Sequence, residues 1–183
     1  MILDRSELLE ALPKDGIVAE LGVDQGNYSG EIISRNRPKK LYLIDVWNTA
    51  RYPEEKYLEV KEKFRKEIAS GAVEIIRADS IEAMTSFPDK FFDWVYVDTN
   101  HKYEQTLKEL EISGQKVKGF LVGHDFCAGN VKKGLQYGVI PAVRDFCDRN
   151  DWEIRYLTLE KCMHCSYALG KIKKSGERNA ILD

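Results

Sequence analysis

Residues 17–29 read Ile-Val-Ala-Glu-Leu-Gly-Val-Asp-Gln-Gly-Asn-Tyr-Ser, a stretch that predicts the fold of the chain around it. The apolar run at its start is typical of a buried strand, and Gly22 and Gly26 then form a short turn. Glycine lets the backbone turn sharply and approach a ligand closely. Asn27 and Ser29 are both good N-cap residues, so a helix is expected to begin near one of them. Strand, glycine turn and helix together form the nucleotide-binding corner of a doubly wound sheet.

The glycine spacing differs from the Gly-x-Gly-x-x-Gly of a turn that binds pyrophosphate. Here Glu20 and Gly22 are followed by Gly26, with Asp24 between the glycines. A carboxylate at that place would repel a pyrophosphate but suits a ligand that carries an amine or another cation. The pattern acidic-x-Gly-x-x-x-Gly resembles the first motif of the class I S-adenosylmethionine-dependent methyltransferases. This resemblance implies that Glu20, Gly22, Asp24 and Gly26 bind S-adenosylmethionine; the alternative is an ordinary strand-to-helix turn.

Composition limits the class of protein. The chain has 183 residues, 43% of them hydrophobic, which is typical of one domain spanning residues 1–183. A net charge of −2 gives no basic field, so a nucleic-acid partner is not expected. No apolar stretch is long enough to cross a bilayer, and the acidic start is unlike a signal peptide. We therefore expect a cytoplasmic protein without a membrane partner.

Four cysteines are expected to be reduced in an intracellular chain of this size: Cys127, Cys147, Cys162 and Cys165. The segment Cys162-Met-His-Cys165 resembles half of a zinc knuckle. A second Cys-x-x-Cys is missing from the sequence, so cysteines in a hairpin turn are the favoured interpretation.

Apolar runs and helical periodicity alternate along the chain. Strands are expected at 17–21, 41–45, 73–76, 91–98 and 119–123, followed by a hairpin at 152–159 and 166–172. Helices are expected at 1–12, 29–36, 53–70, 80–84, about 104–116 and 139–150. This order predicts an α/β protein, with a Rossmann-like seven-stranded, mostly parallel sheet, helices on both faces and a C-terminal antiparallel hairpin. The same arrangement resembles the methyltransferase sheet over nearly the whole chain.

Acidic residues end most of the predicted parallel strands, at the edge where open α/β sheets bind ligands. Asp45 lies about 20 residues beyond the glycine turn, where such folds place an acid that accepts from the ribose hydroxyls. The stretch around Val46 and Trp47 resembles the second methyltransferase motif, and the Trp47 ring could cover the adenine. In the resembled family an acid near Asp79 and Ser80 binds the adenine amino group; a plain helix cap is the alternative.

A second group of polar residues follows the fourth and fifth strands: Asp98, His101, His124 and Asp125. Their surroundings resemble the O-methyltransferases grouped with macrocin-type sugar methyltransferases, and also the cephalosporin-hydroxylase-like proteins. The resemblance implies metal ligands at Asp98 and Asp125 and a general base at His101. Asp98 is also expected to contact the cofactor. His124 stands where the resembled enzymes have an acid, so magnesium or manganese at Asp98, His124 and Asp125 competes with zinc, iron or no metal.

Together these features predict an S-adenosylmethionine-dependent methyltransferase that acts on a hydroxyl of a small molecule, with sugar-containing acceptors among the candidates. The alternatives are a hydroxylase-like enzyme on the same fold and a non-catalytic protein that binds S-adenosylmethionine. The chain lacks a sizeable insertion that could cover an acceptor, so a homodimer is expected to complete that pocket. The sequence does not name the acceptor.

Overall fold

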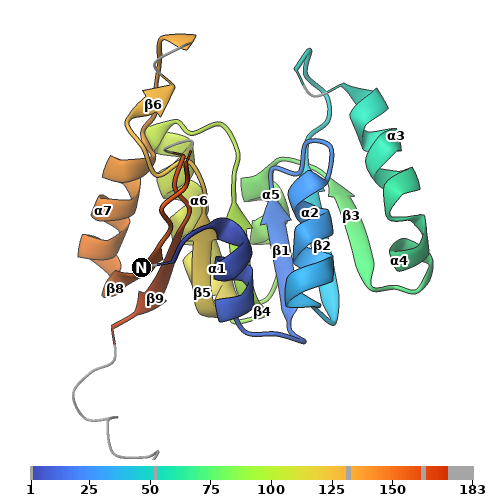
Figure 1. Cartoon of the computed structure of the whole chain (residues 1–183), viewed down its shortest axis with the longest axis horizontal. Helices are drawn as coiled ribbons and strands as arrows, with labels where there is room; N and C mark the ends of the chain where they lie inside the picture. The colour runs from blue at the N-terminus through green and yellow to red at the C-terminus, as the bar shows by residue number, and fades with distance from the viewer. Residues whose placement is uncertain (1, 52, 131–132, 162–163, 173–183) are drawn as a thin grey trace, which may run out of the picture.

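The computed structural model describes residues 2–51, 53–130, 133–161 and 164–172 (Figure 1). Its centre is a seven-stranded sheet of order β3-β2-β1-β4-β5-β9-β8. The strands are β1 (Ile17–Leu21), β2 (Lys40–Asp45), β3 (Val73–Arg77), β4 (Phe92–Val97), β5 (Val117–Gly123), β8 (Trp152–Leu157) and β9 (Tyr167–Lys171). The first five pair in parallel, and β9 joins β5 and β8 antiparallel. The predicted mostly parallel sheet with a closing antiparallel hairpin is confirmed.

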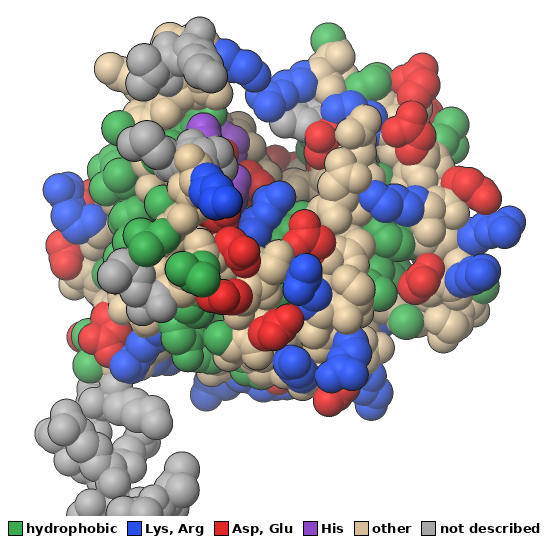
Figure 2. Space-filling view, in the orientation of Figure 1, with side chains coloured by type: hydrophobic (Ala, Val, Ile, Leu, Met, Phe, Trp, Pro, Cys, Tyr) green, Lys and Arg blue, Asp and Glu red, His purple; other side chains and the backbone are tan. Residues whose placement is uncertain are grey.

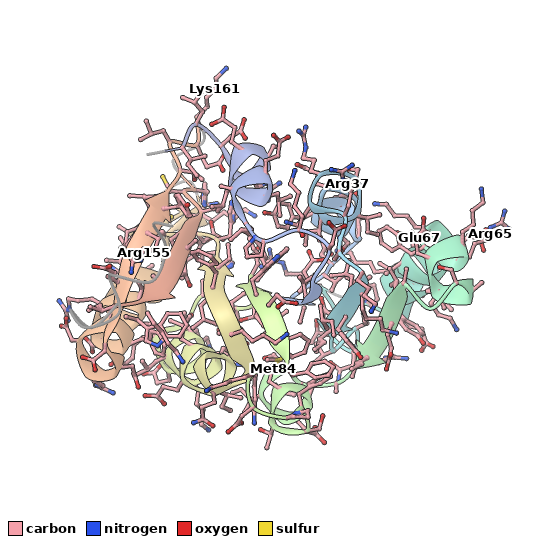
Figure 3. All side chains as sticks on the ribbon, turned by 90° about the horizontal axis from the view of Figure 1, so that it is seen from below. Arg37, Arg65, Glu67, Met84, Arg155 and Lys161 are labelled. Carbon is pink, nitrogen blue, oxygen red and sulfur yellow. The ribbon has the colours of Figure 1, made fainter. Side chains whose placement is uncertain are left out.

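Helices cover both faces of this sheet, because neighbouring residues of each strand point to opposite faces. Val18 of β1 packs with residues of the first helices, whereas Ala19 packs with residues of the later ones. Figure 3 shows the two layers, with Arg37 on one side of the sheet and Met84 on the other. The first layer holds α1 (Arg5–Ala11), α2 (Asn27–Glu31), η1 (Ile32–Asn36), α3 (Glu54–Lys63) and α4 (Arg65–Ala69); the second holds α5 (Ser80–Thr85), α6 (Tyr103–Lys116) and α7 (Val139–Asn150).

Two local expectations need correction, and one short hairpin is added. The helix after the glycine turn begins at Asn27 with Gly26 as its N-cap, so neither Asn27 nor Ser29 caps it. The helix expected over 53–70 is divided at Phe64, whose φ of −107° and ψ of 22° lie outside the helical region. The loop after β5 contains a short hairpin of β6 (Gly129–Asn130) and β7 (Leu135–Gln136). Among the described residues, no helix combines the length and apolar character needed to cross a membrane.

Candidate functional site

The carboxyl ends of β1, β2, β4 and β5 meet at one edge of the sheet. Backbone hydrogen bonds just beyond the strands hold this edge together: Gly22 donates to Ile44 at 2.9 Å, and Asp98 donates to Leu21 at 2.8 Å. His124 donates in the same way to Val97 at 3.2 Å. Figure 2 shows the molecule hollowed at this edge, with histidine side chains beside the hollow. The strand-end acids predicted from the sequence are therefore brought to one place.

The glycine turn fits against the end of β4 without room for a side chain. Gly22 has a φ of +88°, and a Cβ atom added there would lie 1.9 Å from the carbonyl oxygen of Asp98. Gly26 has a φ of +66°, and an added Cβ would lie 2.7 Å from the ring of Phe64. Glycine thus lets the turn approach the end of β4 closely at Gly22, and the Phe64 ring, between α3 and α4, at Gly26.

Asp45 holds the glycine turn from the neighbouring strand. One carboxylate oxygen accepts from the amides of Val23 at 2.8 Å and Asp24 at 3.0 Å. The other accepts from the amide of Val46 at 2.7 Å. The sequence predicts that this carboxylate binds a ribose. In the structure it also accepts from three backbone amides, so a ribose hydroxyl would donate to oxygens that already have partners.

Asp45→Ala is expected to lower the affinity for S-adenosylhomocysteine at least tenfold and to destabilise the fold. Hydrogen bonds to a charged group contribute about 1.5–3 kcal/mol each, and here both the turn and the ligand would lose them. Calorimetric titration and urea unfolding measure the two effects. Asp93→Ala is the matched control, because Asp93 accepts from the amide of Ile17 at 2.7 Å at the opposite end of β1. It should cost stability but leave affinity unchanged; an unaltered dissociation constant in Asp45→Ala would instead misplace the ribose.

Trp47 and Asp24 are tied to each other and to the helices beside them. The Trp47 ring is 0% exposed, donates from Nε1 to the carbonyl oxygen of Asp24 at 2.9 Å and packs on Tyr57. In this conformation it therefore offers no open face to an adenine. The Asp24 carboxylate forms an ion pair with Lys56 of α3. The Lys56 ammonium therefore lies beside the glycine turn, next to the carboxylate that the sequence predicts would repel a pyrophosphate.

Glu20 lies beneath the glycine turn and is only 1% exposed. Its carboxyl accepts a hydrogen bond from the hydroxyl of Ser29, which explains why Ser29 is turned into the structure instead of capping the helix. Burial, with a smaller contribution from the charges of Asp98 and Asp45, raises the pKa of Glu20 to about 8. Glu20 is therefore largely protonated at neutral pH and can donate a hydrogen bond.

The predicted adenine residues have local structural roles. Asp79 is exposed and caps α5, accepting from the amide of Ile81 at 2.9 Å. Ser80 is buried and donates to the carboxylate of Glu109 in α6. Thr99, just beyond β4, donates to the same carboxylate at 2.8 Å. Glu109 thus connects the segments that follow β3 and β4. In the sequence it could be noticed only as an acidic residue within the apolar stripe of a helix.

His101 lies between two carboxylates. Its Nε2 is 3.0 Å from Asp98 Oδ1 and 2.9 Å from Asp125 Oδ2. Burial alone would lower the pKa of His101, but the hydrogen bonds and charges of Asp125 and Asp98 outweigh it and raise that pKa to about 9. The ring therefore carries its proton at neutral pH, and it fills the position between the two carboxylates at which the sequence predicts a metal ion.

Asp125 is surrounded by histidines. Burial would raise its pKa, yet hydrogen bonds from His101, His124 and His164 outweigh burial and hold that pKa well below its usual range. His124 Nδ1 is 3.6 Å from Asp125 and 3.7 Å from Asp98, close enough to share a ligand with both. His164 Nδ1 contacts Asp125 Oδ1 directly. From the sequence, His164 was considered only as part of the segment Cys162-Met-His-Cys165. Cys162 itself lies outside the described residues.

Left-handed backbone accompanies these strand ends. Four residues other than glycine have positive φ just beyond β1, β2, β4 and β5: Asp24 (53°), Trp47 (40°), His101 (60°) and Asp125 (55°). Such conformations are uncommon for residues with a Cβ atom and cluster at functional sites. The site is thus assembled from strained turns on a rigid sheet.

The chain is similar to known proteins in sequence and in fold. Residues 19–126 match the family described as methyltransferase domain. No curated protein matches the chain. The fold is similar to TrmK of M. capricolum in complex with S-adenosylhomocysteine, at 16% identity and a TM-score of 0.64, covering 94% of this chain and 70% of that one. It is also similar to an rRNA methylase from Streptococcus thermophilus, at 16% identity and a TM-score of 0.63, covering 92% and 95%. The pyocyanin biosynthetic protein PhzM is similar at 10% identity and a TM-score of 0.68, covering 93% and 55%.

Proposed function

The chain belongs to the methyltransferase domain family, and we propose that it transfers the methyl group of S-adenosylmethionine to a hydroxyl oxygen of a small molecule. When bound, S-adenosylmethionine would supply a methyl group on a sulfonium: the acceptor oxygen forms a bond to the methyl carbon as the carbon–sulfur bond breaks, and S-adenosylhomocysteine leaves. The residues at the glycine turn suit this ligand, since the side-chain oxygens of Asp24 and Asp45 can accept from its hydroxyl and ammonium groups. The turn also lacks the glycine spacing of a phosphate cradle. The alternatives are a hydroxylase-like enzyme and a non-catalytic binding protein on this fold.

The observation that carries the proposal is His101 held between Asp98 and Asp125 beside the glycine turn. A base that takes the proton of a hydroxyl becomes an imidazolium, and two carboxylates stabilise that product. To act as the base, His101 must first lose its own proton. An acceptor or a cation that engages the carboxylates would weaken their hold on the ring and lower its pKa.

A divalent metal ion is proposed for the same group of side chains, and it would have to displace the His101 ring from between Asp98 and Asp125. Asp98, His124 and Asp125 would hold it, and it would lower the pKa of a bound hydroxyl. The two carboxylates favour magnesium or manganese, whereas His124 favours zinc or iron.

The acceptor is proposed to be a small molecule, with sugar-containing molecules among the candidates. TrmK is named a tRNA methyltransferase in one similar structure, and another neighbour is an rRNA methylase. RNA is not the acceptor favoured here, because the net charge of −2 and the acidic strand ends give phosphates no attraction. PhzM, a biosynthetic protein, has a similar fold. We infer a cytoplasmic enzyme in which a second copy of the chain completes the acceptor pocket.

Calorimetric titration tests the cofactor, and transfer of a labelled methyl group tests the acceptor. S-adenosylhomocysteine should bind and NAD should not, because the turn lacks the Gly-x-Gly-x-x-Gly spacing that binds a pyrophosphate. Label from S-adenosylmethionine should then pass to members of a panel of hydroxylated small molecules, sugars included, and not to ribosomal or transfer RNA. Tight NAD binding without a response to S-adenosylhomocysteine would refute the cofactor, and label on RNA alone would refute the acceptor class.

A further inference from the structure

A second cluster of ligand atoms lies on the other side of Asp125. It consists of Asp125, Cys127 and His164, whose ligand atoms all lie within 4.8 Å of one another. The Cys127 sulfur is 3.8 Å from His164 Nδ1, and the same nitrogen contacts Asp125 Oδ1. A carboxylate, a thiol and an imidazole thus converge on one point.

The fold brings these side chains together from two distant segments. Asp125 and Cys127 follow β5, and His164 precedes β9, which pairs antiparallel with β5. Beyond the paired strands, the amide of Phe126 donates to the carbonyl oxygen of Cys165 at 2.9 Å. The backbone therefore fixes the two segments side by side before any ligand binds, which favours a built site over a chance encounter of side chains.

The two oxygens of Asp125 face different partners. Oδ2 lies 2.9 Å from His101 and belongs to the group proposed above for methyl transfer. Oδ1 contacts His164 and faces the thiol side, and it also lies 3.6 Å from His124 Nδ1. A ligand bound between Oδ1 and the Cys127 thiol therefore leaves the contact of Oδ2 with His101 in place.

We propose that Asp125, Cys127 and His164 bind a zinc-class divalent metal ion. Thiolate and imidazole favour zinc or cobalt over magnesium, which prefers oxygen ligands. Zinc bonds of about 2.3 Å to sulfur and 2.0–2.1 Å to nitrogen, at a tetrahedral angle, place these two atoms roughly 3.5 Å apart. The observed 3.8 Å is close to that separation. Three protein ligands leave the fourth position to water or to a substrate oxygen, and the Cys127 thiol releases its proton to solvent when the metal binds.

Cobalt(II) tests the site without any substrate, because it substitutes for zinc and absorbs in the near ultraviolet when a thiolate binds it. The full chain, stripped with a chelator, should develop this sulfur-to-cobalt band on titration. Cys127→Ser should abolish the band, and His164→Ala should weaken cobalt binding at least tenfold. Cys147→Ser is the matched control, since Cys147 lies in α7 and outside the cluster. It should give the wild-type band.

Thermal unfolding with and without zinc separates binding from folding. A ligand that binds the folded state raises its melting temperature. Zinc should raise it in wild type and Cys147→Ser, and should not raise it in Cys127→Ser or His164→Ala, each compared with its own metal-free form. A cobalt band that persists in Cys127→Ser, or that depends on Cys165 instead, would overturn the proposal. So would a wild-type chain that binds neither metal, which would leave an ion pair between Asp125 and His164 as the whole interaction.

Discussion

Gly22→Ala is expected to destabilise the protein strongly. The new Cβ would lie 1.9 Å from the carbonyl oxygen of Asp98, a backbone atom that no rotamer change can move. The φ of +88° adds a conformational cost of about 1–2 kcal/mol. Overpacking adds about 1–3 kcal/mol. Urea unfolding should therefore show a loss of roughly 2–5 kcal/mol, the sum of these two costs.

Gly30→Ala is the matched control for that experiment. Gly30 lies in α2, and an added Cβ there would meet no heavy atom within 4 Å. Alanine is favoured over glycine inside a helix by about 0.5–1 kcal/mol, so this variant should equal or exceed the wild type in stability. Similar unfolding curves for Gly22→Ala and the wild type would mean that β1 and β4 end farther apart than described.

His101→Asn is expected to give the largest loss of activity once an acceptor is found. Removing a general base lowers turnover by roughly 10²–10⁴-fold. Asparagine is the chosen replacement because it tolerates the left-handed backbone that His101 adopts, with a φ of 60°. Initial rates of methyl transfer measure the effect, and the residual rate should rise with pH as the acceptor ionises without help.

Binding of S-adenosylhomocysteine is the internal control for His101→Asn. His101 contacts the carboxylates beyond β4 and β5, whereas the glycine turn follows β1. Affinity should therefore match the wild type while turnover falls. Wild-type turnover in the variant would reduce His101 to a structural ion-pair partner, and a parallel loss of affinity would indicate a disturbed fold.

The sheet could be predicted from the sequence because its signals are local. Each parallel strand is a short apolar run bounded by turn residues, and β2 in particular ends at the predicted Asp45. The interruption of the helix at Phe64 could not be predicted, because the helical periodicity of Tyr57, Val60, Phe64 and Ile68 continues across it. That ring packs against Gly26, and this long-range contact is not visible in a local pattern.

The part of the site that could be predicted is the part formed by residues at the ends of adjacent parallel strands. Asp98 and Asp125 follow adjacent parallel strands, so their proximity follows from the strand order. His164 is different, because it is 39 residues from Asp125 and reaches it only through the pairing of β9 with β5. The backbone role of Asp45 was also hidden, since hydrogen bonds to amides leave no trace in residue type.

The left-handed residues beyond the strand ends have a consequence for directed evolution of this protein. Trp47 and His101 each hold a conformation that costs about 1–2 kcal/mol for an L-residue with a Cβ atom. Glycine at either position would relieve that cost but would lose more than it gains. Truncating a buried aromatic ring such as Trp47 costs about 3–5 kcal/mol, and removing His101 would leave the carboxylates of Asp98 and Asp125 without their shared cation. A screen for heat resistance alone would therefore retain His101 for its ion pairs, even in chains that no longer methylate. Selection for thermostability should therefore be coupled to an assay of turnover.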